Sequence, residues 1–288
     1  MKQQILASEL PMQNDGTIYH LNLYPEELAD NVILVGDPGR VAMISDMFDS
    51  MEVKKQNREL ITHTGMYKGK RISVISTGMG TDNIDIVLTE LDALVNIDLK
   101  TRTEKEEHRA LNVVRIGTSG ALQSDIELGT TLASSFGLGI DGVFRYYEAG
   151  DICREDIVDA FIRHTGWSNR LPYPYCTPAS PELLERIGHD MRKGVTITAP
   201  GFFGPQGRKV RAALKYPDLN RMLEMFEYQG YKITNMEMEC SAIYGLGNIL
   251  GHRPLTVCLI IANRVTGQFM ENYHEQMAEL SRKVLDRL

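Results

Sequence analysis

The sequence predicts a single α/β domain, in which helices cover both faces of a central, twisted sheet that is mixed but mostly parallel. Two observations support this prediction. Short apolar runs rich in β-branched residues alternate along the chain with segments of helical periodicity. Neither an internal repeat nor a linker rich in Pro, Gly or Ser divides the 288 residues, so we expect one domain over residues 1–288.

Six apolar runs are predicted to be buried strands, because each is short, β-branched and bounded by Gly, Pro or polar turn residues. They are residues 31–35, 71–76, 112–116, 130–135, 195–199 and 255–262. Six other segments carry apolar residues at helical spacing and are predicted to be helices. They are residues 40–48, 82–96, 181–192, 219–229, 237–250 and 271–288. Residues 100–109 (KTRTEKEEHR) have no apolar face, so we expect a charged, solvated insertion between a helix and the following strand.

The charge balance and the composition exclude several classes of partner. The 31 Lys and Arg residues against 38 Asp and Glu residues leave a net charge of −7, so no global positive field attracts nucleic acid or an anionic membrane. The apolar runs are far shorter than the roughly 20 residues of a membrane-spanning helix, and residues 1–15 lack the apolar core of a signal peptide. The 4 cysteines and 7 histidines form no CxxC, HExxH or HxxxH pattern, which argues against disulfides and a transition-metal site. We therefore expect a cytoplasmic protein that holds anions with local arginines.

Two glycine-rich turns follow the first two predicted strands, where open α/β sheets bind their ligands. The turn GDPGR (residues 36–40) offers backbone N–H groups and an arginine to a phosphate or carboxylate, although a plain turn with a solvent-facing arginine has the same pattern. The turn TGMG (residues 77–80) is close to a dinucleotide fingerprint, but Asn83 stands where that pattern needs a glycine. The first turn is a candidate anion site, and the second is weak evidence for a dinucleotide.

The third predicted strand runs into the segment RIGTSG (residues 115–120). Arg115 lies inside an apolar strand, where burying its charge is costly unless an anion pairs with it. The GTSG that follows supplies hydroxyls and backbone amides at the same point. Neither GxxxxGK[ST] nor GxSxG occurs in the chain, which argues against a P-loop and against a serine-hydrolase elbow. An anion site is therefore the favoured interpretation.

Two later segments carry groups suited to a nucleoside. The segment FFGPQGR (residues 202–208) places aromatic rings beside Gln206 and Arg208. A glutamine amide both donates and accepts hydrogen bonds and an arginine donates them, which matches the edge of a uracil-like ring. A polar loop with aromatic anchors is the alternative. The segment NMEMEC (residues 235–240) opens a predicted helix, and its glutamates either cap that helix or bind sugar hydroxyls, with Met238 as an apolar surface under the sugar.

The segments GDPGR, RIGTSGAL, FFGPQGR and NMEME, in this order, resemble the nucleoside phosphorylase family, which includes uridine phosphorylases and hexameric purine nucleoside phosphorylases. The resemblance runs from about Tyr19 to the last predicted helix. It implies a three-layer fold and the reversible phosphorolysis of a nucleoside to a free base and α-ribose 1-phosphate, with inorganic phosphate as co-substrate and no cofactor. It also implies a homo-oligomer, a dimer or a hexamer built as a trimer of dimers, whose active sites are shared between subunits.

The resemblance implies a role for each motif residue. Phosphate would be bound by Gly36, Arg40, Arg115, Thr118 and, across a subunit interface, Arg58. Ribose would be bound by Met238, Glu239 and, from the neighbouring subunit, His20. The base would be bound by Ser119, Gly120, Phe202, Gln206, Arg208 and Ile261. The catalytic set would be Arg115, Gln206 and Arg208. A potassium ion near Glu59, Met79 and Asn83 is the one metal that the family implies, and Asn83, which replaces a serine, argues against it.

The residues after the last predicted strand bear on the choice of base. Purine-specific relatives carry Ser-Asp there, and that aspartate is the acid for purine N7, whereas this sequence reads Ala262-Asn263-Arg264. Together with the Gln206 and Arg208 pair, this favours uridine as substrate and pyrimidine salvage as the role. A purine nucleoside phosphorylase, a hydrolytic nucleosidase and a non-catalytic nucleoside-binding protein are the alternatives.

Overall fold

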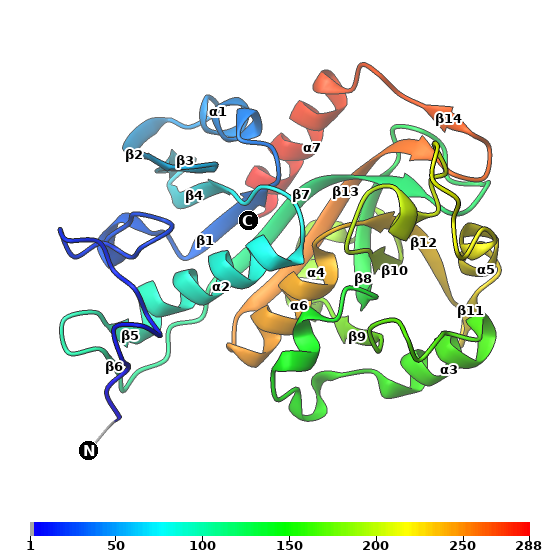
Figure 1. Ribbon diagram of the computed structural model, residues 1–288. Coiled ribbons are helices and arrows are strands. Elements are labelled where there is room, and N and C mark those ends of the chain that lie inside the picture. The colour runs from blue at the N-terminus through cyan, green and yellow to red at the C-terminus, as the bar shows by residue number, and fades with distance from the viewer. Residues whose placement is uncertain (1–2) are drawn as a thin grey trace.

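A computed structural model describes residues 3–288, and its main feature is one mixed sheet of 12 strands (Figure 1). The longer strands are β1 (Asn31–Val35), β2 (Ser50–Asn57), β3 (Leu60–Tyr67), β4 (Lys70–Ser76), β7 (Asn112–Ala121), β8 (Thr131–Gly139), β10 (Arg192–Thr198), β12 (Tyr231–Glu237) and β13 (Arg253–Asn263). The shorter ones are β9 (Tyr175–Pro178), β11 (Glu227–Tyr228) and β14 (Gln268–Phe269). Their order is β11-β12-β10-β8-β13-β7-β1-β4-β3-β2, with β9 beside β8 and β14 beside β13.

The six predicted strands are all present, and among them only the β8–β13 pair is antiparallel. Most of the other antiparallel pairs come from strands that the sequence did not reveal. The hairpin of β2 and β3 is the largest example: β2 (SMEVKKQN) is an edge strand with alternating burial, and its polar composition hides it. The mixed α/β fold expected from the sequence is confirmed.

Helices pack on both faces of this sheet. They are α1 (Gly39–Ser45), α2 (Thr81–Asn96), α3 (Glu155–Thr165), α4 (Pro181–Gly188), α5 (Leu219–Glu224), α6 (Cys240–Ile249) and α7 (His274–Arg287). Helix α2 packs on α6, while α7 packs on α1 and α4; Figure 1 shows α2 in front of the sheet and α7 behind it. Helix α3 was not predicted. No helix within residues 3–288 is long and apolar enough to cross a membrane.

Strand pairing leaves an opening in the middle of the sheet. Strand β7 pairs with β13 along its whole length, but on its other edge it pairs with β1 only at residues 112–115 and with β12 only at Gly120 and Ala121. The β12–β7 pair also closes β7, β13, β8, β10 and β12 into a ring. Within the described chain, residues 116–119 therefore have no strand partner on this edge, and their backbone polar groups there are available to a ligand.

The helix predicted over residues 219–229 ends at Glu224, because Glu227 and Tyr228 pair with β12 as β11. Two other predicted boundaries are wrong for related reasons. The strand predicted to end at Ile116 continues to Ala121, because β13 keeps pairing with it, so GTSG lies within the strand rather than in a loop after it. The helix predicted from Glu237 begins at Cys240, because Glu237 is the last residue of β12 and pairs with Thr198 of β10. The glutamates of NMEME therefore lie at the junction between a strand and a helix.

Most side chains of residues 100–109 are exposed, but Arg102 has a specific contact. Strands β5 (Ile97–Asp98) and β6 (Thr103–Glu104) form a two-stranded ladder. Residues 100–102 lie between these strands, and residues 105–109 follow the second one. The Arg102 guanidinium donates hydrogen bonds to the carbonyl oxygens of Ile5 (3.2 Å) and Leu10. The segment therefore anchors the N-terminal arm, residues 3–24, and does not lie free in solvent throughout.

Candidate functional site

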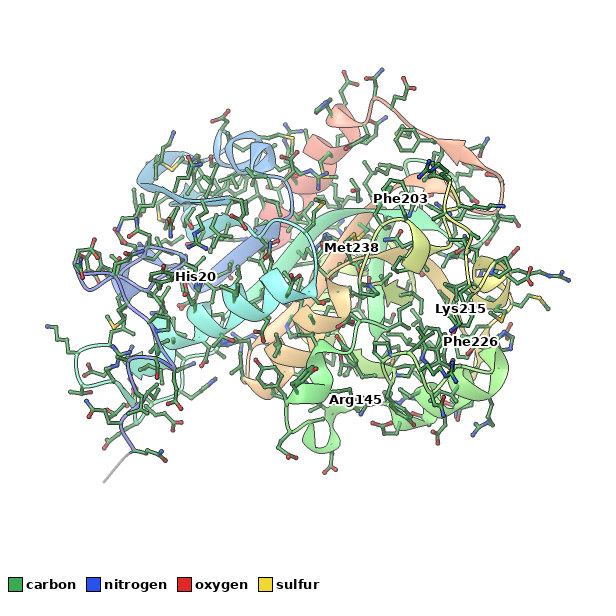
Figure 2. All side chains as sticks on the ribbon, in the orientation of Figure 1. His20, Arg145, Phe203, Lys215, Phe226 and Met238 are labelled. Atoms are coloured by element: carbon green, nitrogen blue, oxygen red, sulfur yellow. The ribbon has the colours of Figure 1, made fainter. Side chains whose placement is uncertain are left out.

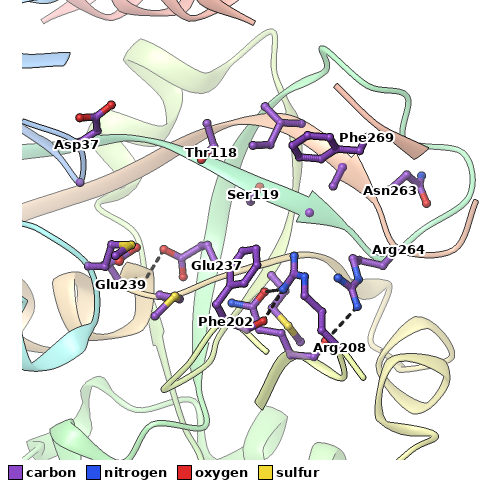
Figure 3. A pocket seen from close by; sticks show the side chains of 18 of the residues that line it. Asp37, Thr118, Ser119, Phe202, Arg208, Glu237, Glu239, Asn263, Arg264 and Phe269 are labelled. Atoms are coloured by element: carbon purple, nitrogen blue, oxygen red, sulfur yellow. Dashed lines mark hydrogen bonds between the residues drawn. The ribbon is translucent and has the colours of Figure 1, made fainter. Parts of the chain in front are cut away.

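A cavity of about 800 Å³ lies at the opening in the sheet, between the ends of β1, β7 and β12. Most of the sequence-predicted residues line it: Gly36, Arg40, Met79, Arg115, Thr118, Ser119, Gly120, Phe202, Gln206, Arg208, Met238, Glu239 and Ile261. Figure 3 shows Asp37 at one end of the cavity, Arg264 and Phe269 at the other, and Glu237 between them. The motifs that lie far apart in the sequence therefore meet at one place, where an elongated ligand fits.

Arg115 stands at the floor of the cavity with an incomplete set of partners. Its side chain is 6% exposed, and its Nη2 donates a hydrogen bond to Glu239. Its Nη1 lies 3.8 Å from Glu237 Oε2, beyond hydrogen-bond distance, and neither Nη1 nor Nε has a hydrogen-bond partner. Buried donors without partners are costly, and an oxyanion entering the cavity would satisfy them.

The groups around Arg115 also suit an anion. A Cβ atom at Gly36 would lie 3.2 Å from the Gly78 carbonyl oxygen and 3.9 Å from Arg115 Nη2, so the GDPGR turn packs tightly against Gly78 beside Arg115. The Asp37 carboxylate accepts a hydrogen bond from the N–H of Gly39 (2.9 Å) and fixes this turn at the start of α1. Arg40 lines the same end and makes no ion pair within residues 3–288. Two guanidinium groups with free donors, one glycine turn and the Thr118 hydroxyl thus surround this end of the cavity.

Gly117 leaves the space that Arg115 occupies. A Cβ atom at Gly117 would overlap the Arg115 guanidinium and lie 2.8 Å from its Cζ. We expect Gly117→Ala to displace this group and to raise the KM for phosphate about 10-fold, because a hydrogen bond to a charged group contributes about 1.5–3 kcal/mol. Steady-state kinetics with varied phosphate measure this effect, and thermal unfolding shows whether the variant is folded. An unchanged KM in a folded variant would contradict the role of Arg115.

Two carboxylates of the strand–helix junction lie against Arg115. The Glu237 carboxylate accepts hydrogen bonds from Thr198 Oγ1 (2.7 Å) and from the N–H groups of Glu239 and Cys240 (2.9 Å each), so it caps the start of α6. Burial raises the pKa of Glu237, and the charge of Arg115 opposes that rise. Glu239 Oε1 accepts a hydrogen bond from the N–H of Gly80 (2.8 Å). The carboxylate predicted to bind ribose therefore lines the cavity and is bonded to Arg115 and Gly80.

The far end of the cavity is formed by a cluster of polar and aromatic side chains. Arg208 donates hydrogen bonds to the Phe202 carbonyl oxygen (2.7 Å) and to Gln206 Oε1, and its Cζ lies 3.7 Å from the centre of the Phe202 ring. Gln206 is buried, whereas Phe202 is 52% exposed and Phe203 does not line the cavity. Since the Gln206 oxygen has two lone pairs, it can accept a second hydrogen bond from a ligand while its NH₂ group donates.

Arg264 is a residue of this end that sequence reasoning did not assign. Its Nη2 donates a hydrogen bond to the Gln206 carbonyl oxygen (3.3 Å). Burial, and then the positive charge of Arg264, lowers the pKa of Arg208 to about 10. Burial also lowers the pKa of Arg264. Two guanidinium groups without a carboxylate partner in the described chain create a positive potential that favours negative charge on a ligand.

The last residues of β13 have different surroundings from one another. A bulge between Ile260 and Ala262 breaks the register with β7, and Ile261 and Ala262 both line the cavity. Asn263 also borders it, but its amide nitrogen donates to the carbonyl oxygens of Gln123 and Ile126 (2.9 Å each), and its oxygen accepts from the N–H of Val265 (2.9 Å). The side chain of Asn263 therefore holds its own loop in place and has no acidic proton to give.

Some predicted residues lie elsewhere. His20 and Arg58 do not line the cavity, and Figure 2 shows His20 on the N-terminal side of the molecule, apart from Met238 and Phe203. Glu59 and Asn83 flank Gly78 rather than the cavity: a Cβ atom at Gly78 would lie 3.5 Å from Glu59 Cγ. The Asn83 amide nitrogen donates to the Thr77 carbonyl oxygen (2.8 Å). Sequence reasoning also missed Glu237, because the sequence predicts a helix from this residue, and Phe269, whose short strand β14 has no clear pattern.

One group of metal-ligating side chains lies outside the cavity. Ligand atoms of Asp92, His108 and His252 lie within 4.8 Å of one another. However, His252 Nδ1 accepts a hydrogen bond from the N–H of Leu111 (3.2 Å), so the neutral ring carries its proton on Nε2, which faces Asp92 Oδ1 at 3.4 Å. A protonated ring nitrogen does not bind a metal, and we interpret this group as a His–Asp contact.

Comparisons with known proteins find relatives over most of the chain. The model of the phosphorylase superfamily matches residues 30–288. A uridine phosphorylase of Thermococcus kodakarensis is 31% identical over 280 residues, which cover 93% of this chain and 86% of the relative. A purine nucleoside phosphorylase of DeoD type from Colwellia psychrerythraea is 26% identical over 86% of this chain and 88% of the relative. The crystal structure of a Trypanosoma brucei nucleoside phosphorylase that shows uridine phosphorylase activity superposes with a TM-score of 0.87, at 31% identity, over 97% of this chain and 99% of that chain.

Proposed function

Because this chain belongs to the phosphorylase superfamily and is a pentosyltransferase, we propose that its substrate is uridine, which it converts reversibly with phosphate to uracil and α-ribose 1-phosphate. The observation that carries the proposal is the pairing of two sites in one cavity. Arg115 with its unpartnered donors lies at one end, and the Gln206 and Arg208 pair lies at the other. Glu239 lies near Arg115 at the cavity floor, within the part that a sugar between phosphate and base would occupy.

The reaction needs charge stabilisation more than a covalent catalyst. As the bond between C1′ and N1 breaks, its electron pair moves onto uracil and the sugar becomes cation-like, and a phosphate oxygen then bonds to C1′. Arg115, Arg40, Gly36 and Thr118 would hold the phosphate below the sugar, and Glu239 with Met238 would hold the ribose. Arg208 and Gln206 would bind the uracil edge and stabilise its negative charge, with Phe202, Ser119, Gly120 and Ile261 around the ring.

The preference for a pyrimidine rests on two features of the base end. Gln206 offers a donor and an acceptor side by side, as the N–H and C=O edge of uracil requires, and Arg208 adds a further donor. At the position where purine-specific relatives carry an acid, Asn263 is neutral and is bonded to its own loop. Both features oppose a purine that must be protonated at N7 to leave, although purine phosphorylases also occur among the relatives.

We further propose that the site is shared between copies of this chain in a homo-oligomer. His20 and Arg58 lie outside the cavity of their own chain but close to each other, since the Arg58 Cζ lies 5.9 Å from the ring centre of Tyr19, the neighbour of His20. In the shared site, His20 would contact the ribose 5′-hydroxyl and Arg58 the phosphate. A pyrimidine-salvage role and a cytoplasmic location stay predictions, as does the argument that Asn83 opposes a potassium ion near Glu59 and Met79.

Base release from two nucleosides, measured with and without phosphate, tests the proposal. We expect uracil to be released from uridine only when phosphate is present, with much slower release of hypoxanthine from inosine, because Asn263 supplies no acid. Chromatography of the free bases and of ribose 1-phosphate measures both. Uracil release without phosphate would indicate a nucleosidase, release from inosine alone would indicate a purine phosphorylase, and binding without release would indicate a binding protein.

A further inference from the structure

Glu90 of α2 is a buried residue, 5% exposed, that has no role in the site described so far. Its carboxylate is hydrogen-bonded to the N-terminal arm. It accepts hydrogen bonds from the N–H groups of His20 (2.9 Å) and Leu21 (2.8 Å), and it lies 2.6 Å from Nδ1 of the His20 ring. A buried carboxylate is costly unless it is fully hydrogen-bonded, and all three partners of Glu90 belong to two adjacent residues of the arm.

We propose that Glu90 is a positioning residue: it fixes the orientation and the tautomer of His20, so that Nε2 faces outward to accept a hydrogen bond from the 5′-hydroxyl of a nucleoside in the neighbouring copy's cavity. This inference rests on the proposed function and on the shared site. It adds to them the residue that prepares His20 and the direction of the hydrogen bond that His20 makes.

The tautomer follows from the chemistry of the contact. A carboxylate only accepts hydrogen bonds, so the ring nitrogen at 2.6 Å from Glu90 Oε1 carries the proton. In the neutral ring, Nε2 then has a free lone pair and acts as an acceptor. The His20 side chain is 25% exposed, and its Nε2 makes no hydrogen bond within residues 3–288. Because a carboxylate holds Nδ1, the ring presents Nε2 in a defined direction. Carboxylates that bond to the metal-binding histidines of other proteins orient those rings in the same way.

A second set of contacts holds the same part of the arm. The Asn57 amide nitrogen donates hydrogen bonds to the carbonyl oxygens of Tyr19 (3.1 Å) and His20 (2.9 Å). Asn57 ends β2, and the next residue, Arg58, has a φ of +54°, a left-handed conformation that is strained for a side chain other than glycine. Arg58 makes no ion pair within residues 3–288. The arm and the hairpin tip thus bring together the His20 ring, whose Nε2 has no hydrogen-bond partner within residues 3–288, and the Arg58 guanidinium, which contacts the Tyr19 ring but forms no ion pair there.

The ratio of kcat/KM for uridine to kcat/KM for 5′-deoxyuridine, which lacks the 5′-hydroxyl, shows whether Glu90 positions His20 or only stabilises the fold. The wild-type enzyme should prefer uridine in kcat/KM by about 10-fold, the size of one hydrogen bond. In Glu90→Gln the amide places an NH₂ group among the donors of the arm, so the preference should fall to about 2-fold while the KM for phosphate stays unchanged. His20→Ala should abolish the preference, and the double variant should show the same ratio as His20→Ala, because both residues act through one contact.

Asp92→Asn, a change of the same kind on the same helix, is the matched control and should keep the full preference, since Asp92 faces His252. A Glu90→Gln enzyme that slows both nucleosides equally and keeps the preference would overturn the proposal and leave only a structural role. Absence of uridine phosphorolysis in the wild type would instead refute the proposed function. Nitrogen NMR of labelled histidines, with His20→Gln for assignment, does not depend on activity: we expect the proton on Nδ1, and a proton on Nε2 would also overturn the proposal.

Discussion

Arg115→Ala should lower kcat/KM for phosphorolysis of uridine by about 10²–10³, which is the usual loss when one donor to the charge of a transition state is removed. Arg115 has two buried donor atoms, Nε and Nη1, without a partner in the described chain, at the end of the cavity proposed to bind phosphate. The effect should appear in the KM for phosphate as well as in kcat, because in the proposed mechanism the same contacts would hold phosphate before and during the reaction. Initial rates over a grid of phosphate and uridine concentrations measure both.

The alanine variant also removes the cation between Glu237 and Glu239, and breaking a buried ion pair in this way costs about 3–5 kcal/mol of stability. Arg115→Lys therefore accompanies it: the ammonium group keeps the charge but lacks the forked donors, so we expect a folded enzyme with weaker phosphate binding. Arg253→Ala, on the neighbouring strand but outside the cavity, is the control. Wild-type kinetics in a folded Arg115→Lys enzyme would contradict the assignment of phosphate to this end.

The sequence was most informative where a side chain was out of place in its local pattern. Arg115 lies inside an apolar strand and therefore indicated an anion site, and the structure places it at the cavity floor with unpartnered donors. The positions of six strands and six helices along the chain also follow from local composition and periodicity, whereas β2, β3, β12 and α3 were missed. These features depend on neighbours in the sequence, which is why single-sequence reasoning could find them.

The features that sequence reasoning missed depend on contacts between distant segments. Glu237 was read as part of a helix because two glutamates at its start are common as caps, but pairing with Thr198 keeps it in β12. Arg264 reaches the cavity because a bulge in β13 redirects the residues after it, and no local pattern marks a bulge. Likewise, Glu90 is one of several charged residues on an amphipathic helix, and only the packing of the N-terminal arm against that helix shows that it contacts His20.

The contact between Arg115 and Glu239 also implies that the binding of phosphate and the binding of the nucleoside are coupled in the proposed reaction. The carboxylate that would bind ribose is bonded to the guanidinium that would bind phosphate. An incoming phosphate competes for Arg115, and the Glu239 oxygen that it displaces becomes available to the ribose hydroxyls. The two substrates should therefore favour each other's binding, as two ligands do when each stabilises the same rearranged state.

Arg208→Ala should lower kcat by about 10² while the KM for phosphate changes little, since Arg208 lies at the opposite end of the cavity from Arg115. The physical reason is that uracil would leave as an anion in the proposed reaction, and the positive charges of Arg208 and Arg264 would stabilise it. Rates in single-turnover experiments measure the step directly. Arg211→Ala is the matched control, because Arg211 is an exposed arginine of the same loop that does not line the cavity.

The leaving group itself gives a sharper test of that role. Fluorine at C5 stabilises the uracil anion, so 5-fluorouridine needs less help from the enzyme, and the loss caused by Arg208→Ala should be smaller for 5-fluorouridine than for uridine. If Arg208 only held the ring of Phe202 in place, at 3.7 Å from its centre, both substrates would lose the same factor. Equal losses would therefore assign Arg208 to positioning of the loop, and unequal losses in the expected direction would assign it to the charge of the departing base.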